Sequence, residues 1–180
     1  AELKANQGSG ESNAAMGPVI NQGAYNSITN YIEIGRKEGN VVFGGTYSDA
    51  EGYYIDPTVI RDIKRDARIA NEEIFGPVVT IQTFDTEEEA IAIANDTVYG
   101  LAGAVFTKDG ARALRVVKEI RAGIMWINCY NPAFVEAPWG GYKKSGTGRE
   151  LSKEGLDEYT ETKQITINLN PGELGWYEKR

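Results

Sequence analysis

The sequence contains no histidine and only one cysteine, Cys129, among its 180 residues. Without histidine, the chain by itself has no Cys-His or Ser-His-Asp catalysis and no zinc or iron site with histidine ligands. A single cysteine cannot form an internal disulfide, and such low cysteine usage is typical of a reducing compartment. The sequence therefore predicts a cytoplasmic protein without a metal site.

The chain also lacks long apolar runs and any excess of basic residues. No run approaches the ~20 apolar residues that a membrane-spanning helix needs, and the N-terminal stretch lacks the pattern of a signal peptide. Twenty-six acidic and 19 basic residues give a net charge of -7, which disfavours nucleic acid and anionic membranes as partners. A globular protein with neither kind of partner is expected.

Alternating strand-like and helix-like runs in the middle of the chain predict an α/β fold. Strand-like runs cover 78–84, 102–106 and 123–128. An amphipathic run capped by Asp85 and the helical run DGARALRVVKEIR lie between them. This order is typical of two βαβ units, which form parallel strands with right-handed crossovers. The sequence therefore predicts a parallel-rich sheet built from βαβ units.

The flanking segments predict further elements and a short C-terminal extension. A helix is expected from Asn21 to Gly39, followed by strands at 40–45 and 58–63. Near the end, a short helix around Leu156 precedes a β-branched strand, Gln164 to Leu169, and a polar tail. A lone strand after the βαβ units is an unpaired edge, so pairing with another subunit is expected.

The segment from Cys129 to Gly148 follows neither a helical nor a strand period. Loops longer than ~12–15 residues are usually functional or disordered, and the aromatic residues of this one disfavour disorder. It also follows the carboxyl end of a strand, where open α/β sheets bind their ligands. The sequence therefore places a candidate binding site in this loop.

Cys129 is the one thiol that this candidate site could use as a nucleophile. A reactive thiolate needs a histidine, a nearby cation or a helix N-terminus to lower its pKa. Cys129 follows a strand-like run and lies shortly before Pro132, so no helix N-terminus is evident. We interpret it as a small apolar residue in a pocket wall, with a catalytic thiol as the alternative.

Two further segments carry chemistry that the residues alone leave open. In NEEIFGPVV (71–79), Glu72 and Glu73 are either solvated charge or include a carboxylate that a Phe-Gly-Pro corner directs toward ribose hydroxyls. In PWGGYKKSGTGRE (138–150), the glycine spacing matches neither the Rossmann nor the Walker pattern. We interpret those glycines as backbone turns, and the nearby aromatic residues as packing, with a cation cage as the alternative.

Four motifs in order resemble the aldehyde dehydrogenase superfamily: EEIFGPVV, AND-x-x-YGLAGAVFT, GIMWINCYNP and PWGGYKKSGTGRELSKEGLDEYTETK. The resemblance runs from about Met16 to Leu169. It is strongest to the betaine aldehyde and amino-aldehyde branch, because APWGGYK carries tryptophan where many relatives have phenylalanine. It implies that residues 1–162 form the C-terminal part of a catalytic domain, and that 163–180 form an oligomerisation strand and tail.

The resemblance also implies an activity that this chain would share with a longer polypeptide. Members of the family oxidise an aldehyde with NAD or NADP: a cysteine thiolate attacks the aldehyde, hydride passes to nicotinamide, and water hydrolyses the thioester. The nucleophilic cysteine, the general-base glutamate and the dinucleotide-binding domain are expected upstream of Ala1. The chain alone is therefore expected to be inactive and to hold no catalytic residue, with Cys129 excluded as the nucleophile.

Residue by residue, the resemblance implies positioning roles for this chain. Glu73 would accept hydrogen bonds from the nicotinamide ribose, and Phe75 would pack against the cofactor. Cys129, Phe134 and Trp139 would line the aldehyde tunnel. Lys153 replaces a proton-relay glutamate of some members, so no such role is carried over. The alternative function is a non-catalytic module, derived from the family, that serves assembly or binding.

Overall fold

The computed structural model describes residues 7–8, 14–170 and 172. Its first long helix is the amphipathic α2 (Gln22–Glu38). The side chain of Asn21 caps the helix by accepting a hydrogen bond from the amide of Ala24 at 2.9 Å. The helix ends at Gly39, as the sequence predicts. Ile28 and Ile32 on its inner face are fully buried and form the centre of the core.

This helix covers a three-stranded sheet with the order β1-β4-β5. Strand β4 pairs antiparallel with β1 and parallel with β5. Gly35 lets α2 approach the sheet closely, because a Cβ there would lie 2.4 Å from the Cδ1 atom of the buried Ile60. The elements of this first part are β1 (Asn40–Phe43), the hairpin strands β2 (Tyr47–Ser48) and β3 (Tyr54–Ile55), β4 (Thr58–Arg61), α3 (Arg68–Asn71) and β5 (Val78–Ile81).

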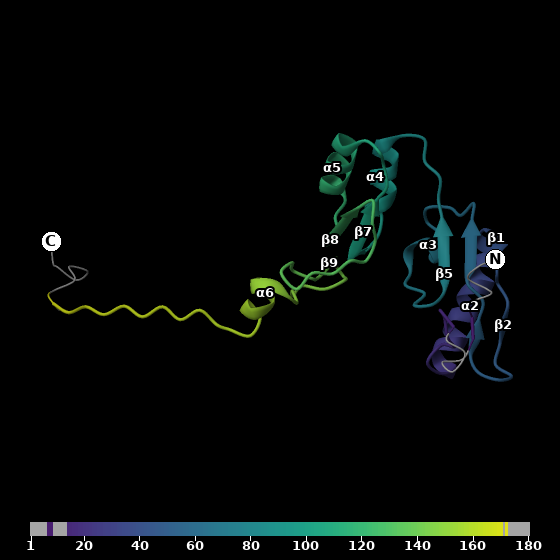
Figure 1. Cartoon of the computed structure of the whole chain (residues 1–180), viewed down its shortest axis with the longest axis horizontal. Helices are drawn as coiled ribbons and strands as arrows, with labels where there is room; N and C mark the ends of the chain where they lie inside the picture. The colour runs from purple at the N-terminus through teal and green to yellow at the C-terminus, as the bar shows by residue number, and fades with distance from the viewer. Residues whose placement is uncertain (1–6, 9–13, 171, 173–180) are drawn as a thin grey trace, which may run out of the picture.

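A second part lies beside the first and contains a smaller parallel pair, β7-β8, joined by helix α5 (Figure 1). Its buried hydrophobic residues include Ala113 and Val116 of α5, Ala122, and Trp126 of β8. Its elements are α4 (Glu87–Asn95), β6 (Tyr99–Gly100), β7 (Ala102–Val105), α5 (Gly110–Glu119), β8 (Ile124–Ile127), β9 (Tyr142–Lys143) and α6 (Ser152–Asp157).

The α/β fold class is confirmed, but the strand pairing differs from the prediction in one place. The unit β7-α5-β8 forms as expected. Strands β5 and β7 of the second expected unit are not paired with each other in the described residues, where β5 pairs with β4 and β7 with β8. Alternating periodicity identifies strands but not their partners, and the short helix α3 completes a βαβ unit that periodicity misses. The cap of α4 is also Thr86 rather than Asp85.

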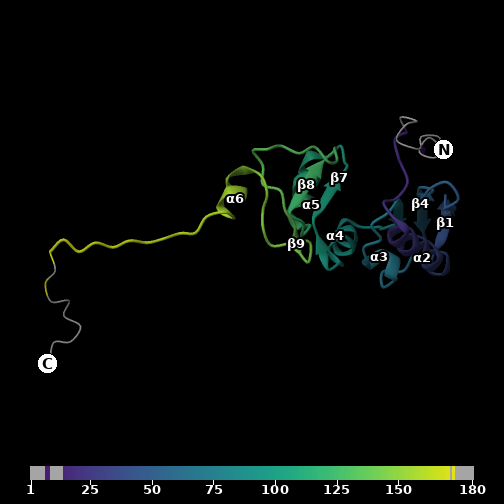
Figure 2. The same ribbon diagram turned by 90° about the horizontal axis from the view of Figure 1, so that it is seen from below.

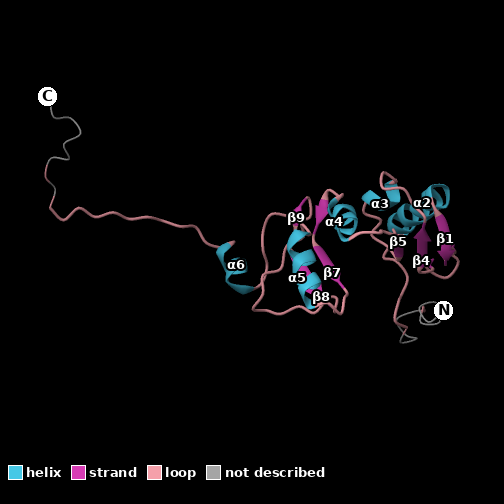
Figure 3. Ribbon diagram, turned by 90° about the horizontal axis from the view of Figure 1, so that it is seen from above, coloured by secondary structure: helices cyan, strands magenta, loops and turns pink. Residues whose placement is uncertain are grey.

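The two sheets turn unpaired edges toward each other. In Figures 1 and 3 the strands follow in the order β8, β7, β5, β1 across the molecule, so β7 and β5 are the neighbouring edges. Within the described residues, β5 has only β4 as a partner and β7 only β8. Val79 and Ile81 of β5 are exposed. Strand β5 therefore leaves one edge unpaired and two apolar side chains exposed in the described part of the chain.

The C-terminal segment extends away from α6 without a partner (Figures 1 and 2). No strand is formed over 164–169 in the single chain, because a strand needs a neighbour to complete its hydrogen bonds. Ile165, Ile167 and Leu169 are exposed there. Residues 171 and 173–180 of the predicted tail lie outside the described residues.

No helix in the described part of the chain has the length and apolar character required to cross a membrane.

Candidate functional site

The predicted site residues fall into two groups on different parts of the fold. Glu73 and Phe75 lie in the corner between α3 and β5, in the first part. Cys129, Phe134 and Trp139 follow the carboxyl end of β8, in the second part. The two groups therefore lie on different elements of this chain, one in the corner before β5 and one in the loop after β8.

The corner from Glu72 to Gly76 exposes its two predicted contact residues. The backbone of Phe75 has a φ of 52°, in the left-handed region, and its ring is 88% exposed. Glu73 is exposed and makes no hydrogen bond or ion pair to another described residue. Its carboxylate oxygens are therefore available to accept hydrogen bonds from a ligand.

The neighbours of these two residues are fixed to the protein. Ile74 packs against both clusters of the hydrophobic core. Gly76 lies so close to α2 that an added Cβ would be 2.7 Å from side-chain atoms of Ile28. The corner is thus anchored by residues that alternate with the exposed ones.

A polar cluster that the sequence reasoning missed lies at the start of this corner. It consists of Tyr31 on α2, Arg68 on α3 and Glu72, and we call it the Tyr31–Arg68–Glu72 cluster. Glu72 accepts hydrogen bonds from Arg68 Nε at 3.0 Å and Nη2 at 2.8 Å, and from the Tyr31 hydroxyl at 2.7 Å. The Arg68 guanidinium also lies 5.7 Å from the centre of the Tyr31 ring.

These contacts shift the titration of the cluster. The hydrogen bonds from Arg68 and then Tyr31 lower the pKa of Glu72 to about 2. The hydrogen bond to Glu72 in turn raises the pKa of Tyr31. The spacing of four between Arg68 and Glu72 was a usable sequence signal for a helical ion pair, whereas Tyr31 is too distant in sequence to be connected with them.

The loop that carries Cys129 begins at a constrained turn. Asn128 has a φ of 55°. Its side-chain oxygen accepts a hydrogen bond from the Thr107 amide at 2.8 Å, and its side-chain nitrogen donates to the Thr107 carbonyl at 2.9 Å. The turn after β8 is thereby fastened to the end of β7. Cys129 follows this turn and its side chain is exposed.

Trp126 organises the aromatic residues of this loop. It is only 8% exposed, and its ring lies 5.1 Å from that of Tyr130 and 6.1 Å from that of Trp139. Its Nε1 atom donates a hydrogen bond to the Pro132 carbonyl at 3.0 Å. Phe134 is 63% exposed. Trp126 is a supporting residue that the sequence patterns do not single out, although it is the aromatic residue inside the predicted strand.

The glycine-rich segment after Trp139 folds by close backbone contacts, as predicted. Trp139 and Glu150 exchange two backbone hydrogen bonds of 2.7 Å. Arg149 Nη1 donates to the carbonyls of Gly141 and Gly148 at 2.9 and 2.8 Å. A cavity of about 350 Å³ lies against Trp139, Gly140 and this arginine. The segment therefore shapes a hollow beside Trp139 without forming a phosphate loop.

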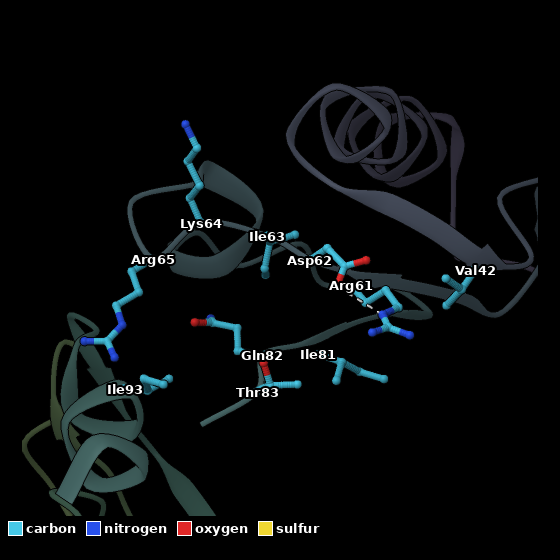
Figure 4. A pocket seen from close by; sticks show the side chains of 10 residues that line it. All are labelled: Val42, Arg61, Asp62, Ile63, Lys64, Arg65, Ile81, Gln82, Thr83 and Ile93. Carbon is cyan, nitrogen blue, oxygen red and sulfur yellow. Dashed lines mark hydrogen bonds and ion pairs between the residues drawn. The ribbon is translucent and has the colours of Figure 1, made fainter. Parts of the chain in front are cut away.

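A larger cavity of about 670 Å³ lies at the carboxyl ends of β4 and β5 (Figure 4). Its lining combines charged residues at the end of β4 with Ile81 of β5 and Ile93 of α4. Within it, Arg61 is paired with Asp62 at 3.2 Å. None of the predicted site residues lines it. Within the described residues, no group of three His, Cys, Asp or Glu side chains is arranged to hold a metal ion.

Comparison with known proteins gives a consistent result across sequence and structure. The model of the aldehyde dehydrogenase family matches residues 1–165. The chain is 47% identical to a chloroplastic betaine aldehyde dehydrogenase of Atriplex hortensis and 45% identical to the peroxisomal aminoaldehyde dehydrogenase 2 of Pisum sativum, in each case over 93% of this chain and 34% of the relative.

The solved structures agree. A crystal structure of betaine aldehyde dehydrogenase from Staphylococcus aureus in complex with NAD+ is 45% identical and superposes with a TM-score of 0.91, over 99% of this chain and 37% of that one. The chain thus spans about a third of the length of the relatives it matches. It belongs to the aldehyde dehydrogenase family.

Proposed function

We propose that this chain supplies cofactor-positioning and aldehyde-contacting surfaces to an NAD(P)-dependent aldehyde dehydrogenase. The preferred substrate would be betaine aldehyde or an amino-aldehyde, which is oxidised to its carboxylate. The observation that carries the proposal is the superposition, over 99% of the chain, on an NAD+-bound betaine aldehyde dehydrogenase.

The Glu73 corner fits a nicotinamide dinucleotide. Glu73 has no partner among the described residues, so its carboxylate can accept two hydrogen bonds from a ribose diol. Phe75 presents an exposed ring beside it, suited to contact with an apolar face of the ligand. When bound, the nicotinamide accepts the hydride. The role of Glu73 and Phe75 is to hold the ribose and thereby orient the ring.

The loop after β8 fits the aldehyde side. Cys129, Phe134 and Trp139 form its proposed wall, with Trp139 held in place by Trp126. Aromatic faces attract a quaternary or protonated amine by roughly 0.5–2 kcal/mol, and the carboxylate of Glu136 lies in the same loop. These features favour a cationic aldehyde over a neutral one of equal size.

We assign the nucleophile and the general base to a part of the enzyme outside these 180 residues. Cys129 follows a strand and a turn rather than a helix N-terminus, and the sequence offers it no histidine partner. In the proposed full-length enzyme, another segment of the polypeptide would lie between the two sheets. The unpaired edges of β5 and β7 support this placement, and so does the cavity in Figure 4.

The C-terminal segment supports an oligomer. Residues 163–180 would form the oligomerisation strand and tail, and residues 1–162 would belong to the catalytic domain. Exposed Ile165, Ile167 and Leu169 alternate with polar residues, which is the pattern of a strand with one face to bury. The location in the cell stays a prediction, because the named relatives include chloroplastic and peroxisomal forms.

A comparison of two aldehydes tests the proposal. The proposed full-length protein should reduce NAD+ or NADP+ with betaine aldehyde, and its kcat/KM should exceed that for the neutral isostere 3,3-dimethylbutanal. Trp139→Leu should diminish this preference several-fold, because it removes an aromatic face. A better kcat/KM for the neutral isostere in the wild type would contradict a cation site, and no aldehyde oxidation at all would favour the non-catalytic module.

A further inference from the structure

The corner that carries Glu73 is attached to the protein through Glu72, the residue directly before it. Glu72 follows the last residue of α3 and adopts an extended backbone, with φ −100° and ψ 149°. In extended backbone, successive side chains lie on opposite sides. Glu72 and Ile74 both contact the protein, and Glu73 between them has no partner among the described residues.

The Tyr31–Arg68–Glu72 cluster differs from an ordinary surface ion pair. Isolated exposed pairs stabilise a protein by little, but bidentate pairs that belong to a network are more rigid. Here both carboxylate oxygens are occupied, one of them doubly, by donors from two different helices. The cluster therefore fixes the end of α3 to α2 at the point where the corner begins.

The far side of the corner is fixed by packing instead. Gly76 lies against Ile28, which is fully buried in α2. Phe75, directly before it, is held in the left-handed backbone region that few side chains adopt freely. Both ends of the corner are thus fastened to the same helix, one by polar contacts and one by packing.

We propose that Tyr31, Arg68 and Glu72 are positioning residues for the cofactor. They act through Glu73 and Phe75, whose direction they set by holding the corner against α2. The inference rests on the proposed function, since it assumes that Glu73 contacts the ribose. Loss of the cluster should therefore weaken dinucleotide binding and leave the aldehyde site, on the other part of the fold, unchanged.

The test uses the proposed full-length protein with Glu72→Gln, Tyr31→Phe and the double variant. Tyr31→Phe removes one hydrogen bond and keeps the ring beside Arg68, so the fold should survive even if Glu72→Gln is less stable. Each single variant should raise the Kd for NAD+, measured by calorimetry, by roughly threefold to tenfold, the effect of one hydrogen bond. The double variant should be close to the more severe single one, because the two residues share one contact.

Glu87→Gln is the matched control. Glu87 accepts two hydrogen bonds from Arg115, at 2.6 and 2.8 Å, and so forms an equally bidentate pair on α4 and α5. Glu87→Gln should lower the melting temperature about as much as Glu72→Gln does, but it should leave the Kd for NAD+ unchanged. The KM for the aldehyde should stay constant in all variants.

Two outcomes separate the inference from the proposed function. If Glu73→Gln weakens NAD+ binding but neither Glu72→Gln nor Tyr31→Phe does, the positioning role is wrong and the proposed function stands. If the wild-type protein neither binds a nicotinamide dinucleotide nor oxidises an aldehyde, the proposed function fails and this inference fails with it.

Discussion

At the scale of a single residue, the position of Cys129 in the fold favours a role as a wall residue rather than as the nucleophile. It is exposed after β8, at the end of a turn that Asn128 fastens to Thr107. Cys129→Ala in the proposed full-length enzyme should keep kcat/KM within about 200-fold of wild type, because trimming a pocket wall costs ~1–3 kcal/mol. Steady-state kinetics with betaine aldehyde measure this. A loss of a million-fold would identify Cys129 as the nucleophile instead.

For Glu73, in contrast to Cys129, the charge of the side chain should matter more than its size. Glu73→Gln retains one acceptor oxygen but loses hydrogen bonds to a charged group, which are worth ~1.5–3 kcal/mol. We expect kcat or the KM for NAD+ to change while the KM for the aldehyde stays nearly constant. A variant in which only the aldehyde KM changed would show that Glu73 does not contact the ribose.

At the scale of residues, the sequence identifies candidate ligand-contacting residues better than it identifies the residues that hold them in place. Glu73, Phe75 and Trp139 stand in short motifs whose residue types suggest ligands. Tyr31 and Trp126 support them from elsewhere in the chain, through a hydrogen bond to Glu72 and a ring contact with Trp139. Such contacts depend on how helices and strands pack, so local patterns do not reveal them.

At the scale of elements, a close backbone contact joins Gly123, the residue directly before β8, to the glycine-rich segment after Trp139. A Cβ added to Gly123 would lie 1.9 Å from the carbonyl oxygen of Gly140, the residue after Trp139. Gly123→Ala should therefore destabilise the protein by about 1–3 kcal/mol or more. Gly110→Ala is the control, because nothing lies within 4 Å of an added Cβ there and alanine favours a helix. Equal melting temperatures for the two variants would contradict the contact.

The attachment of α3 to α2 should depend on pH. The pKa of Glu72 is about 2 in the folded protein, below its usual value near 4.5. Its stabilising contribution is therefore complete above pH 4.5 and is lost as the pH falls toward 2. The difference in melting temperature between wild type and Glu72→Gln should shrink from pH 7 to pH 2.5. A difference that stayed constant over this range would show that the charged cluster does not fasten the helices.

Elements were more predictable than their pairing. Capping by Asn21 and the stop at Gly39 are local signals, and the bounds of α2 follow them closely. The partner of β5 is set by the chain's path through α3, a helix of a single turn whose sequence has no clear period. Periodicity therefore gives the order of strands and helices but not which sheet each strand joins.

At the scale of the whole molecule, the two sheets and the extended C-terminal segment each leave an apolar surface uncovered. Deleting 164–180 from the proposed full-length enzyme should reduce its oligomeric state or its solubility, because an apolar strand needs a partner. Light scattering measures the mass. An unchanged oligomer with intact activity would contradict a role for this segment in assembly.

The central claim is that this chain positions cofactor and aldehyde for a nucleophile that lies outside it. The most direct measurement is the rate of NADH formation from betaine aldehyde by the purified 180-residue chain and by the proposed full-length enzyme. The account predicts no formation by the chain alone and turnover by the full-length enzyme that survives Cys129→Ala. NADH formation by the chain alone that disappears with Cys129→Ala would contradict it.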